Sequence, residues 1–186
     1  MKKLTIIAMV MLLVGSIARA DYQAGVEYLK QGQVKQALAE FEMDIDIYGT
    51  YWYYPAYMAA VCYYQLKDYD AALMRLREAE TATEQSQTRI LDLANIKFLE
   101  AQILVAEGKY SNAVALADKY IPQAPADLQA KLYYIKGFAE NKAGQHSKAV
   151  NDLIQAIGLD DGDAGSYYQL GLAYVKNNNY DSAIKN

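Results

Sequence analysis

The feature that most constrains the fold of this chain is an internal repeat. Five segments share an apolar stretch around a small residue, then a short turn, then an alanine twelve positions after the small residue. The small residues, called anchors below, are Gly25, Ala60, Ala101, Gly137 and Gly171, and the matching alanines are Ala37, Ala72, Ala113, Ala149 and Ala183. Anchors spaced 35, 41, 36 and 34 residues apart indicate a stack of supersecondary units, each a pair of helices.

A turn residue lies at the same place in every copy. These residues are Gly32, Lys67, Gly108, Gly144 and Asn178. Glycine and asparagine tolerate the left-handed backbone conformation that commonly ends a helix. Four of the five positions therefore predict a helix end and a sharp reversal, and Lys67 is the exception.

With these residues in place, the sequence resembles the tetratricopeptide repeat family, whose unit is a helix-turn-helix of about 34 residues. The fifth copy, "DDGDAGSYYQLGLAYVKNNNYDSAIKN", carries Leu170, Gly171, Tyr174, Tyr180 and Ala183 where the family pattern has Leu, Gly, Tyr, Tyr and Ala. The resemblance implies an all-α fold, a right-handed superhelix (α-solenoid) of about five helical hairpins with the last one incomplete. The repeats are expected over residues 21–50, 53–84, 94–125, 130–161 and 164–186.

Two places depart from the repeat. The polar stretch Glu80–Thr88 is longer than a repeat needs, so either the first helix of the third copy is extended or a flexible insertion lies there. The fifth copy stops at Asn186, a few residues into its second helix. Solenoids usually end in a complete, polar capping helix. This end is therefore either truncated or completed by self-association with a partner copy.

The first twenty residues have the layout of a secretory signal peptide. A basic start at Lys2 and Lys3 precedes an apolar stretch from Leu4 to Val14, and residues 18–20 form a small-x-small cleavage site. The apolar stretch is short for a bilayer span, which needs about 20 residues, although an uncleaved anchor is the alternative. No cysteine follows it, so a lipid-anchored form is excluded. We expect a periplasmic or secreted chain, without membrane insertion after cleavage at Asp21.

Charge and cysteine content exclude several classes of protein. The formal charge is −4, and it becomes −7 without residues 1–20, which carry three cations and no acid. A mildly acidic chain without a basic run argues against a nucleic-acid partner and against binding to anionic lipid. Cys62 is the one cysteine, so no disulfide can form within the chain. Its apolar neighbours predict a small buried side chain rather than a reactive thiol.

The resemblance implies that the first helices of successive repeats line a concave groove. One aromatic column would run three residues before each anchor, through Tyr22, Tyr57, Phe98, Tyr134 and Tyr168. A second column, four residues after each anchor, would be Leu29, Tyr64, Val105, Asn141 and Val175. A third, partly basic, would include Lys30, Lys142 and Lys176, which could hold a carboxylate of a ligand.

The stretch Tyr48–Gln65 concentrates seven tyrosines and the one tryptophan, and the register divides them. Cys62 and Tyr63 are expected in the core, and Tyr48, Tyr51 and Trp52 at one lip of the groove. Tyrosine offers a large contact area, few torsions to freeze and a hydroxyl, which suits a binding surface. The predicted partner-binding residues are Tyr54, Tyr57, Tyr64, Phe98, Tyr134 and Lys142. The alternative is that the rings pack between repeats, which is the interpretation favoured for Tyr22 and Tyr168.

No residue pattern supports catalysis, a metal site or a cofactor site. His146, the one histidine, stands at a turn position that holds tyrosine in other copies, so a packing role is expected. One histidine and one distant cysteine cannot form a zinc cluster. The stretch "LDDGDAG" resembles a calcium loop, but Leu172 stands where that loop needs glutamate. It is better explained as the connection between copies four and five, with Asp163 as a helix cap.

The sequence therefore predicts a non-catalytic scaffold or adaptor of the bacterial cell envelope that binds a protein or peptide in an aromatic groove. Many exported proteins that share this repeat are adaptors, and this is what the resemblance implies at the level of class. Three alternatives remain open: a self-assembling structural protomer, the regulatory part of a longer enzyme, and a module that stacks glycans on its aromatic rings. Fold alone does not separate them.

Overall fold

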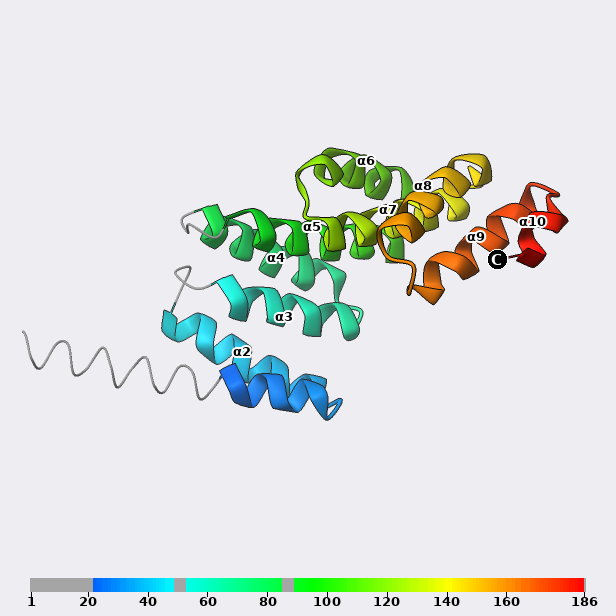
Figure 1. Cartoon of the computed structure of the whole chain (residues 1–186). Coiled ribbons are helices and arrows are strands. Elements are labelled where there is room, and N and C mark those ends of the chain that lie inside the picture. Colours follow the sequence, from blue (N-terminus) through cyan, green and yellow to red (C-terminus); the bar gives the residue numbers. More distant parts are fainter. Residues whose placement is uncertain (1–21, 49–52, 85–88, 186) are drawn as a thin grey trace, which may run out of the picture. The chain divides into compact units, whose positions relative to one another are not determined.

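The computed structural model describes residues 22–48, 53–84 and 89–185, shown as coloured ribbon in Figure 1. The regular secondary structure in these ranges is helical, which confirms the predicted all-α fold of tetratricopeptide-type hairpins. None of the described helices has the length and hydropathy that a bilayer crossing requires. The predicted signal peptide, residues 1–20, lies outside the described residues. The chain divides into two compact units, Met1–Gln87 and Thr88–Asn186, and each is described by itself.

The first unit holds two hairpins. A helix over residues 22–30 pairs with α2 (Val34–Tyr48), and α3 (Tyr53–Gln65) pairs with α4 (Tyr69–Glu84). Helices α2 and α3 also pack against each other, so the two hairpins share a core. Phe41, Ala59 and Cys62 are fully buried at its centre. The cause is the apolar repeat pattern, because a helix pair can bury its apolar faces only against a neighbouring pair.

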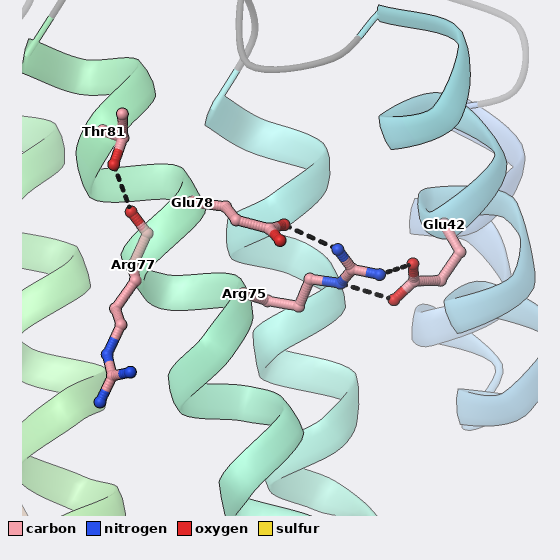
Figure 2. Close-up of polar contacts among 5 residues, drawn as sticks. All are labelled: Glu42, Arg75, Arg77, Glu78 and Thr81. Carbon is pink, nitrogen blue, oxygen red and sulfur yellow. Dashed lines mark hydrogen bonds and ion pairs between the residues drawn. The ribbon is translucent and has the colours of Figure 1, made fainter.

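An ion-pair cluster joins these two hairpins (Figure 2). The guanidinium of Arg75 on α4 reaches Glu42 on α2 through two nitrogens: Nε lies 2.9 Å from Oε1, and Nη2 pairs with Oε2. Its third nitrogen, Nη1, lies 2.7 Å from Oε2 of Glu78. A planar guanidinium suits such two-pronged contacts with a carboxylate. Arg75 therefore links helices of successive repeats with fixed geometry.

The second unit contains the rest of the array. Its helices are α5 (Arg89–Ala106), α6 (Tyr110–Tyr120), a short 3₁₀ helix η2 (Ile121–Gln123), α7 (Ala126–Lys142), α8 (His146–Leu159), α9 (Ala164–Lys176) and α10 (Tyr180–Lys185). The pairs α5–α6, α7–α8 and α9–α10 are hairpins, and α7 also packs against α5 and α9. Helices α5, α7 and α9 therefore adjoin in sequence order, as first helices of stacked repeats do (Figure 1).

The anchors and the alanines bring the two helices of a hairpin close together. Ala37, Ala72, Ala113 and Ala149 are fully buried. A Cβ built on Gly25 would lie 2.6 Å from the ring of Phe41, and one on Gly137 would lie 2.6 Å from Cγ of Leu153. A side chain at either glycine would overlap the facing helix. The role predicted for the small residues is therefore observed in the first and fourth copies.

The five predicted turn residues all adopt a left-handed backbone. The φ angles are 73° at Gly32, 63° at Lys67, 76° at Gly108, 77° at Gly144 and 59° at Asn178. In each turn a backbone N–H bonds back into the helix that ends there, as Gly32 N–H does to Leu29 O at 2.9 Å. Lys67 takes this conformation although its Cβ makes it costly. The repeat geometry therefore determines the backbone here, and the residue type follows it in four of five copies.

The long polar stretch between copies two and three is helical on both sides. Helix α4 continues to Glu84, and α5 begins at Arg89, before the position 94 expected for the third repeat. The first helix of the third copy is thus extended, as the first of the two expected alternatives has it, while residues 80–84 belong to α4 of the second copy. Residues 85–88 lie outside the described ranges. Helix α7 likewise begins at Ala126, ahead of the expected position 130.

Candidate partner-binding groove

A cavity of about 570 Å³ opens in the second unit where α5, α7 and the α8–α9 loop meet. Its lining includes aromatic, charged and small residues. The lining residues are Phe98, Ala130, Lys131, Tyr134, Ala156, Asp160, Gly162, Asp163 and Ser166. Two predicted groove residues, Phe98 and Tyr134, are thus brought together in one site. They come from the first helices of adjacent repeats, which is where the register places them.

Tyr134 is one of the two aromatic residues that line this cavity. It is half-buried, and its ring centroid lies 6.2 Å from that of Phe138 one turn later on α7. Gly165 at the start of α9 leaves room for it, because a Cβ there would come within 3.3 Å of the ring. Burial, and then the negative charge of Asp163, raise the pKa of Tyr134. Both effects keep the phenol of Tyr134 in its neutral form, which can donate a hydrogen bond.

The α8–α9 loop forms the acidic wall of the cavity, and Asp163 shapes it. The side chain of Asp163 accepts hydrogen bonds from the backbone N–H groups of Gly165 at 3.1 Å and Ser166 at 3.0 Å. It also accepts one from the hydroxyl of Ser166 at 2.6 Å. These contacts satisfy free N–H groups at the start of α9, so the predicted helix cap is confirmed. Asp163 holds the loop and α9 in fixed relation to Tyr134.

Asp160 and Lys131 are the exposed charges of the cavity. One carboxylate oxygen of Asp160 accepts the backbone N–H of Gly162 at 3.1 Å. Within the described ranges, its other oxygen has no hydrogen-bond or ion-pair partner, and the ammonium of Lys131 has none either. Both residues are exposed and line the cavity. They are available to charges that a ligand brings.

The sequence argument missed three of these polar residues: Lys131, Asp160 and Ser166. It treated the loop as a connection and Asp163 as a cap only. Lys131 could have been found from the repeat register, because it stands one turn before Tyr134 on the same helix face. Where the loop residues of the next hairpin lie depends on how hairpins stack, which periodicity in a single helix does not specify.

The remaining aromatic candidates lie on α3 in the first unit. Tyr54 is 42% exposed, and its ring centroid lies 4.0 Å from that of Tyr53 and 6.4 Å from that of Tyr22. Tyr57 is half-buried, and burial raises its pKa. Tyr64 is half-buried beside Tyr69, at 6.1 Å between ring centroids. Their role in binding stays a prediction.

Two lysines of the predicted clamp, Lys142 and Lys30, each lie near a group on their own helix, and their role in binding stays a prediction. Lys142 is exposed at the end of α7, but its Nζ lies 5.3 Å from the ring centroid of Phe138 and does not line the cavity. Lys30 pairs with Glu27 at 3.4 Å on its own helix. Side chains of this length turn back on neighbouring groups of the same helix, which helical spacing alone does not reveal. Lys131 is the lysine that lines the cavity.

Several packing assignments can be compared with the structure. Cys62 is fully buried, and burial raises the pKa of its thiol to about 12, so its assignment as a small core residue is confirmed. Tyr22 packs against Phe41 at 5.7 Å between ring centroids, as expected. The packing role assigned to Tyr168 is wrong, because this side chain is 70% exposed. Tyr63 is half-buried at the edge of the core beside Glu42. Tyr51 and Trp52 lie outside the described residues.

A buried polar network occupies one predicted groove position. Asn141 is only 8% exposed, and its amide donates to the backbone oxygen of Gln169 on α9 at 3.0 Å. The oxygen of the same amide lies 3.2 Å from Nδ1 of His146. Asn141 is therefore a contact between repeats rather than a groove residue. His146 has a packing and hydrogen-bonding role, and within the described ranges no cluster of three metal-binding side chains occurs.

Comparisons with known proteins agree with this architecture. The family model described as "Tetratricopeptide repeat" matches residues 164–186. The mouse (Mus musculus) Superkiller complex protein 3 is 34% identical over 73 residues, which is 39% of this chain and 5% of that protein. The chain thus spans only a small part of this relative.

Similar solved structures include three tetratricopeptide-fold proteins. MamA (residues 41 to the end) from Desulfovibrio magneticus RS-1 superposes with a TM-score of 0.72 at 19% identity, covering 90% of this chain and 89% of that one. PilF of Pseudomonas aeruginosa has a TM-score of 0.77 at 14% identity, with 92% and 74% covered. YrrB, described as a TPR protein with an unusual peptide-binding site, has a TM-score of 0.62 at 15% identity, with 89% and 80% covered. At these identities the likeness concerns the fold.

Proposed function

Because this chain is built from tetratricopeptide repeats, we propose that it is a non-catalytic scaffold that binds a segment of another protein in the cavity at α5, α7 and the α8–α9 loop. The observation that carries the proposal is that Phe98 and Tyr134, from adjacent repeats, line one cavity together with exposed charged residues. A volume of about 570 Å³ is within the range of binding sites for compact ligands. It would hold one or two side chains of a longer peptide.

The chemistry of the cavity suits a peptide. Aromatic rings supply contact area at a small loss of side-chain entropy, and a few polar groups fix orientation. Here the rings are half-buried, so they are held by the fold yet reach the cavity. A catalytic role would need a nucleophile or an acid–base pair within hydrogen-bond reach of a substrate. The hydroxyl of Ser166 instead donates to Asp163 and is 1% exposed as a residue.

We place this function in the cell envelope on the basis of residues 1–20, whose charge and hydropathy pattern is that of an exported protein. The test is expression in a bacterium followed by fractionation and N-terminal sequencing of the recovered protein. A mature N-terminus at Asp21 in the periplasmic or secreted fraction supports export. A full-length chain confined to the cytoplasm would contradict it.

The test of the binding function is a pull-down from an envelope extract with three baits: wild type, Tyr134→Ala and Tyr180→Ala. Tyr134 lines the cavity, whereas Tyr180 is 57% exposed and lies outside it. We expect a protein that wild type and Tyr180→Ala retain and Tyr134→Ala loses, with the helix content of all three equal by circular dichroism. Equal capture by all three baits would place binding elsewhere.

Self-association is a second candidate function, favoured by the surface of the last hairpin. A second cavity, of about 650 Å³, lies on this hairpin and is largely apolar; its lining residues are Ala164, Tyr167, Tyr168, Gly171, Leu172, Val175 and Ala183. Tyr168 and Val175 are 70% and 43% exposed there. Sedimentation velocity over a concentration series tests this. Oligomers in wild type that disappear in Tyr168→Ala would support it, and a monomer throughout would exclude it.

A further inference from the structure

We propose that the cavity at Phe98 and Tyr134 selects a cationic side chain, lysine or arginine, in the bound segment. The inference rests on the proposed function, since it names the chemistry of the residue that this same site takes. It reverses the preference that the sequence suggested, which was a lysine clamp for an acidic ligand. Three features of the cavity carry it: the balance of charge, the free oxygen of Asp160, and the aromatic surfaces beside it.

The charge of the lining is net negative. Asp160 and Asp163 contribute two carboxylates, and Lys131 contributes one ammonium. Two further acids adjoin the site without lining it: Asp127, one turn before Lys131 on α7, and Asp161 in the loop. A cleft lined by one sign of charge raises the local concentration of ligands of the other sign. The net negative charge of the site would repel a carboxylate ligand and attract an ammonium or guanidinium.

The two carboxylates have different roles. Both oxygens of Asp163 already accept hydrogen bonds from the start of α9, and the positive end of that helix offsets part of its charge. Asp160 lies just after the end of α8, where the helix dipole adds negative potential, and keeps one oxygen without a partner in the described ranges. Asp160 is therefore the counter-ion that a ligand cation would contact. Asp163 adds to the negative charge of the cavity lining.

The aromatic walls complete the site for a cation. The face of an aromatic ring attracts a positive charge within about 6 Å of its centroid. The same unit already contains three such contacts. Lys142 lies 5.3 Å from the ring centroid of Phe138. Lys97 and Lys119 lie 5.5 Å and 5.0 Å from that of Tyr120. Phe98 and Tyr134 have no such cation within the described ranges. The long apolar stem of a lysine or arginine would pack along them while its head meets Asp160.

The test uses peptide mixtures, because the partner is not identified. Three fluorescein-labelled nonapeptide mixtures carry arginine, norleucine or glutamate at the central position and equal, uncharged mixtures elsewhere. Binding to the purified protein is measured by fluorescence anisotropy at 50 mM and 300 mM salt. We expect the arginine mixture to bind more tightly than the norleucine mixture, and the glutamate mixture more weakly than both. The preference for arginine should shrink at the higher salt concentration.

Charge variants then assign the preference to the cavity. Asp160→Asn should reduce the ratio of arginine to norleucine affinity by about threefold, the size expected for a partly exposed ion pair. Lys131→Gln should raise the same ratio, because it removes a like charge. Asp161→Asn is the matched control: it makes the same change one residue along the loop but does not line the cavity. We expect it to shift the ratio less than Asp160→Asn does.

The outcomes separate this inference from the function on which it rests. Binding of norleucine or glutamate mixtures that equals or exceeds arginine binding, and that Tyr134→Ala abolishes, would keep the groove and overturn the cationic preference. An arginine preference unaffected by Asp160→Asn would also overturn it. If no mixture binds, and the Tyr134→Ala bait captures the same proteins as wild type, the binding function of this cavity itself is wrong.

Discussion

Gly137 on α7 lies directly against Leu153 on α8, with 2.6 Å between the position of a Cβ on the glycine and Cγ of the leucine. Leu153 is fully buried, so it has no space to move into. The same relation joins Gly25 to Phe41 in the first copy. In the fifth copy, the nearest atom to a Cβ on Gly171 is the backbone oxygen of Ala183, at 3.9 Å. One repeat position thus has two packing environments.

Alanine substitution at these two anchors should therefore have opposite effects on stability. Gly137→Ala should lower the free energy of unfolding by about 1–3 kcal/mol, because it overpacks a buried helix contact. Gly171→Ala should raise it by about 0.5–1 kcal/mol, since alanine is the better helix former and the contact is open. Urea unfolding followed by circular dichroism measures both. A destabilised Gly171→Ala would show that the fifth hairpin packs as tightly as the fourth.

Lys67→Gly should stabilise the first unit. Lys67 has a φ of 63°, a conformation that disfavours any residue with a Cβ, and its side chain is exposed. Glycine relieves this cost but increases the entropy of the unfolded chain, so the net gain should be about 1 kcal/mol. The measurement is the unfolding midpoint in urea, and Lys109→Gly, which precedes α6 at a φ of −82°, is the control. A loss of stability in Lys67→Gly would count against the predicted strain.

Arg75→Lys should weaken the contact between the first two hairpins although it keeps the charge. Lysine cannot reproduce the two parallel bonds to Glu42 together with the bond to Glu78. We expect a loss of about 1 kcal/mol in the free energy of unfolding. Arg77→Lys is the matched control, because the guanidinium of Arg77 makes none of the contacts drawn in Figure 2. An equal loss of unfolding free energy in the two variants would mean that the two-pronged geometry of the Arg75 contacts does not stabilise the protein.

Glu140 should make the stability of the second unit depend on pH. It is 2% exposed, its Oε2 has no hydrogen-bond partner within the described ranges, and it stands where tyrosine occupies the first, second and fifth copies. Burial raises its pKa to about 8, and the nearby carboxylate of Asp152 adds to the rise. Lys136 and Lys148 act in the opposite direction. Lys136 is itself shared, at 3.2 Å from Asp152 and 2.7 Å from Asp118.

The direction in which stability changes with pH follows from proton binding. The folded pKa is above the ordinary value of 4.5, so the folded state holds the proton more strongly than the unfolded state does. The contribution of Glu140 is fully present below pH 4.5 and is lost as pH rises through about 8. Urea midpoints at pH 5, 6.5 and 8 should fall less steeply for Glu140→Gln than for wild type. Parallel pH profiles for the two proteins would show that Glu140 does not titrate in this range.

The hairpins could be predicted because each depends on local rules. The turn at Gly108 needs a residue that tolerates positive φ, and the buried alanine at Ala113 needs a partner helix that comes close. Both requirements recur at a fixed spacing, so the five copies together predict the hairpins more firmly than any one copy does. Lys67 shows the limit of residue type, since its conformation follows from the repeat and not from lysine.

The cavity could be predicted only in part. Phe98 and Tyr134 follow from the register, because both occupy the same position on first helices. Asp160 reaches the site only through the path of the α8–α9 loop, which depends on how α9 stacks beside α7. Asn141 has the helical position of a groove residue, yet it bonds to Gln169 of the next repeat. Contacts between repeats therefore decide which members of a column stay available for a ligand.

The burial of Cys62 has a practical consequence for spectroscopy. It is the one cysteine of the chain, it is fully buried, and burial raises the pKa of its thiol to about 12, so it is almost entirely un-ionised at neutral pH. Maleimide and spin-label reagents react with exposed thiolates. An added cysteine at an exposed loop position such as Asp161 would therefore be the sole labelling site. The native chain therefore needs no removal of Cys62 before a probe is placed beside the groove.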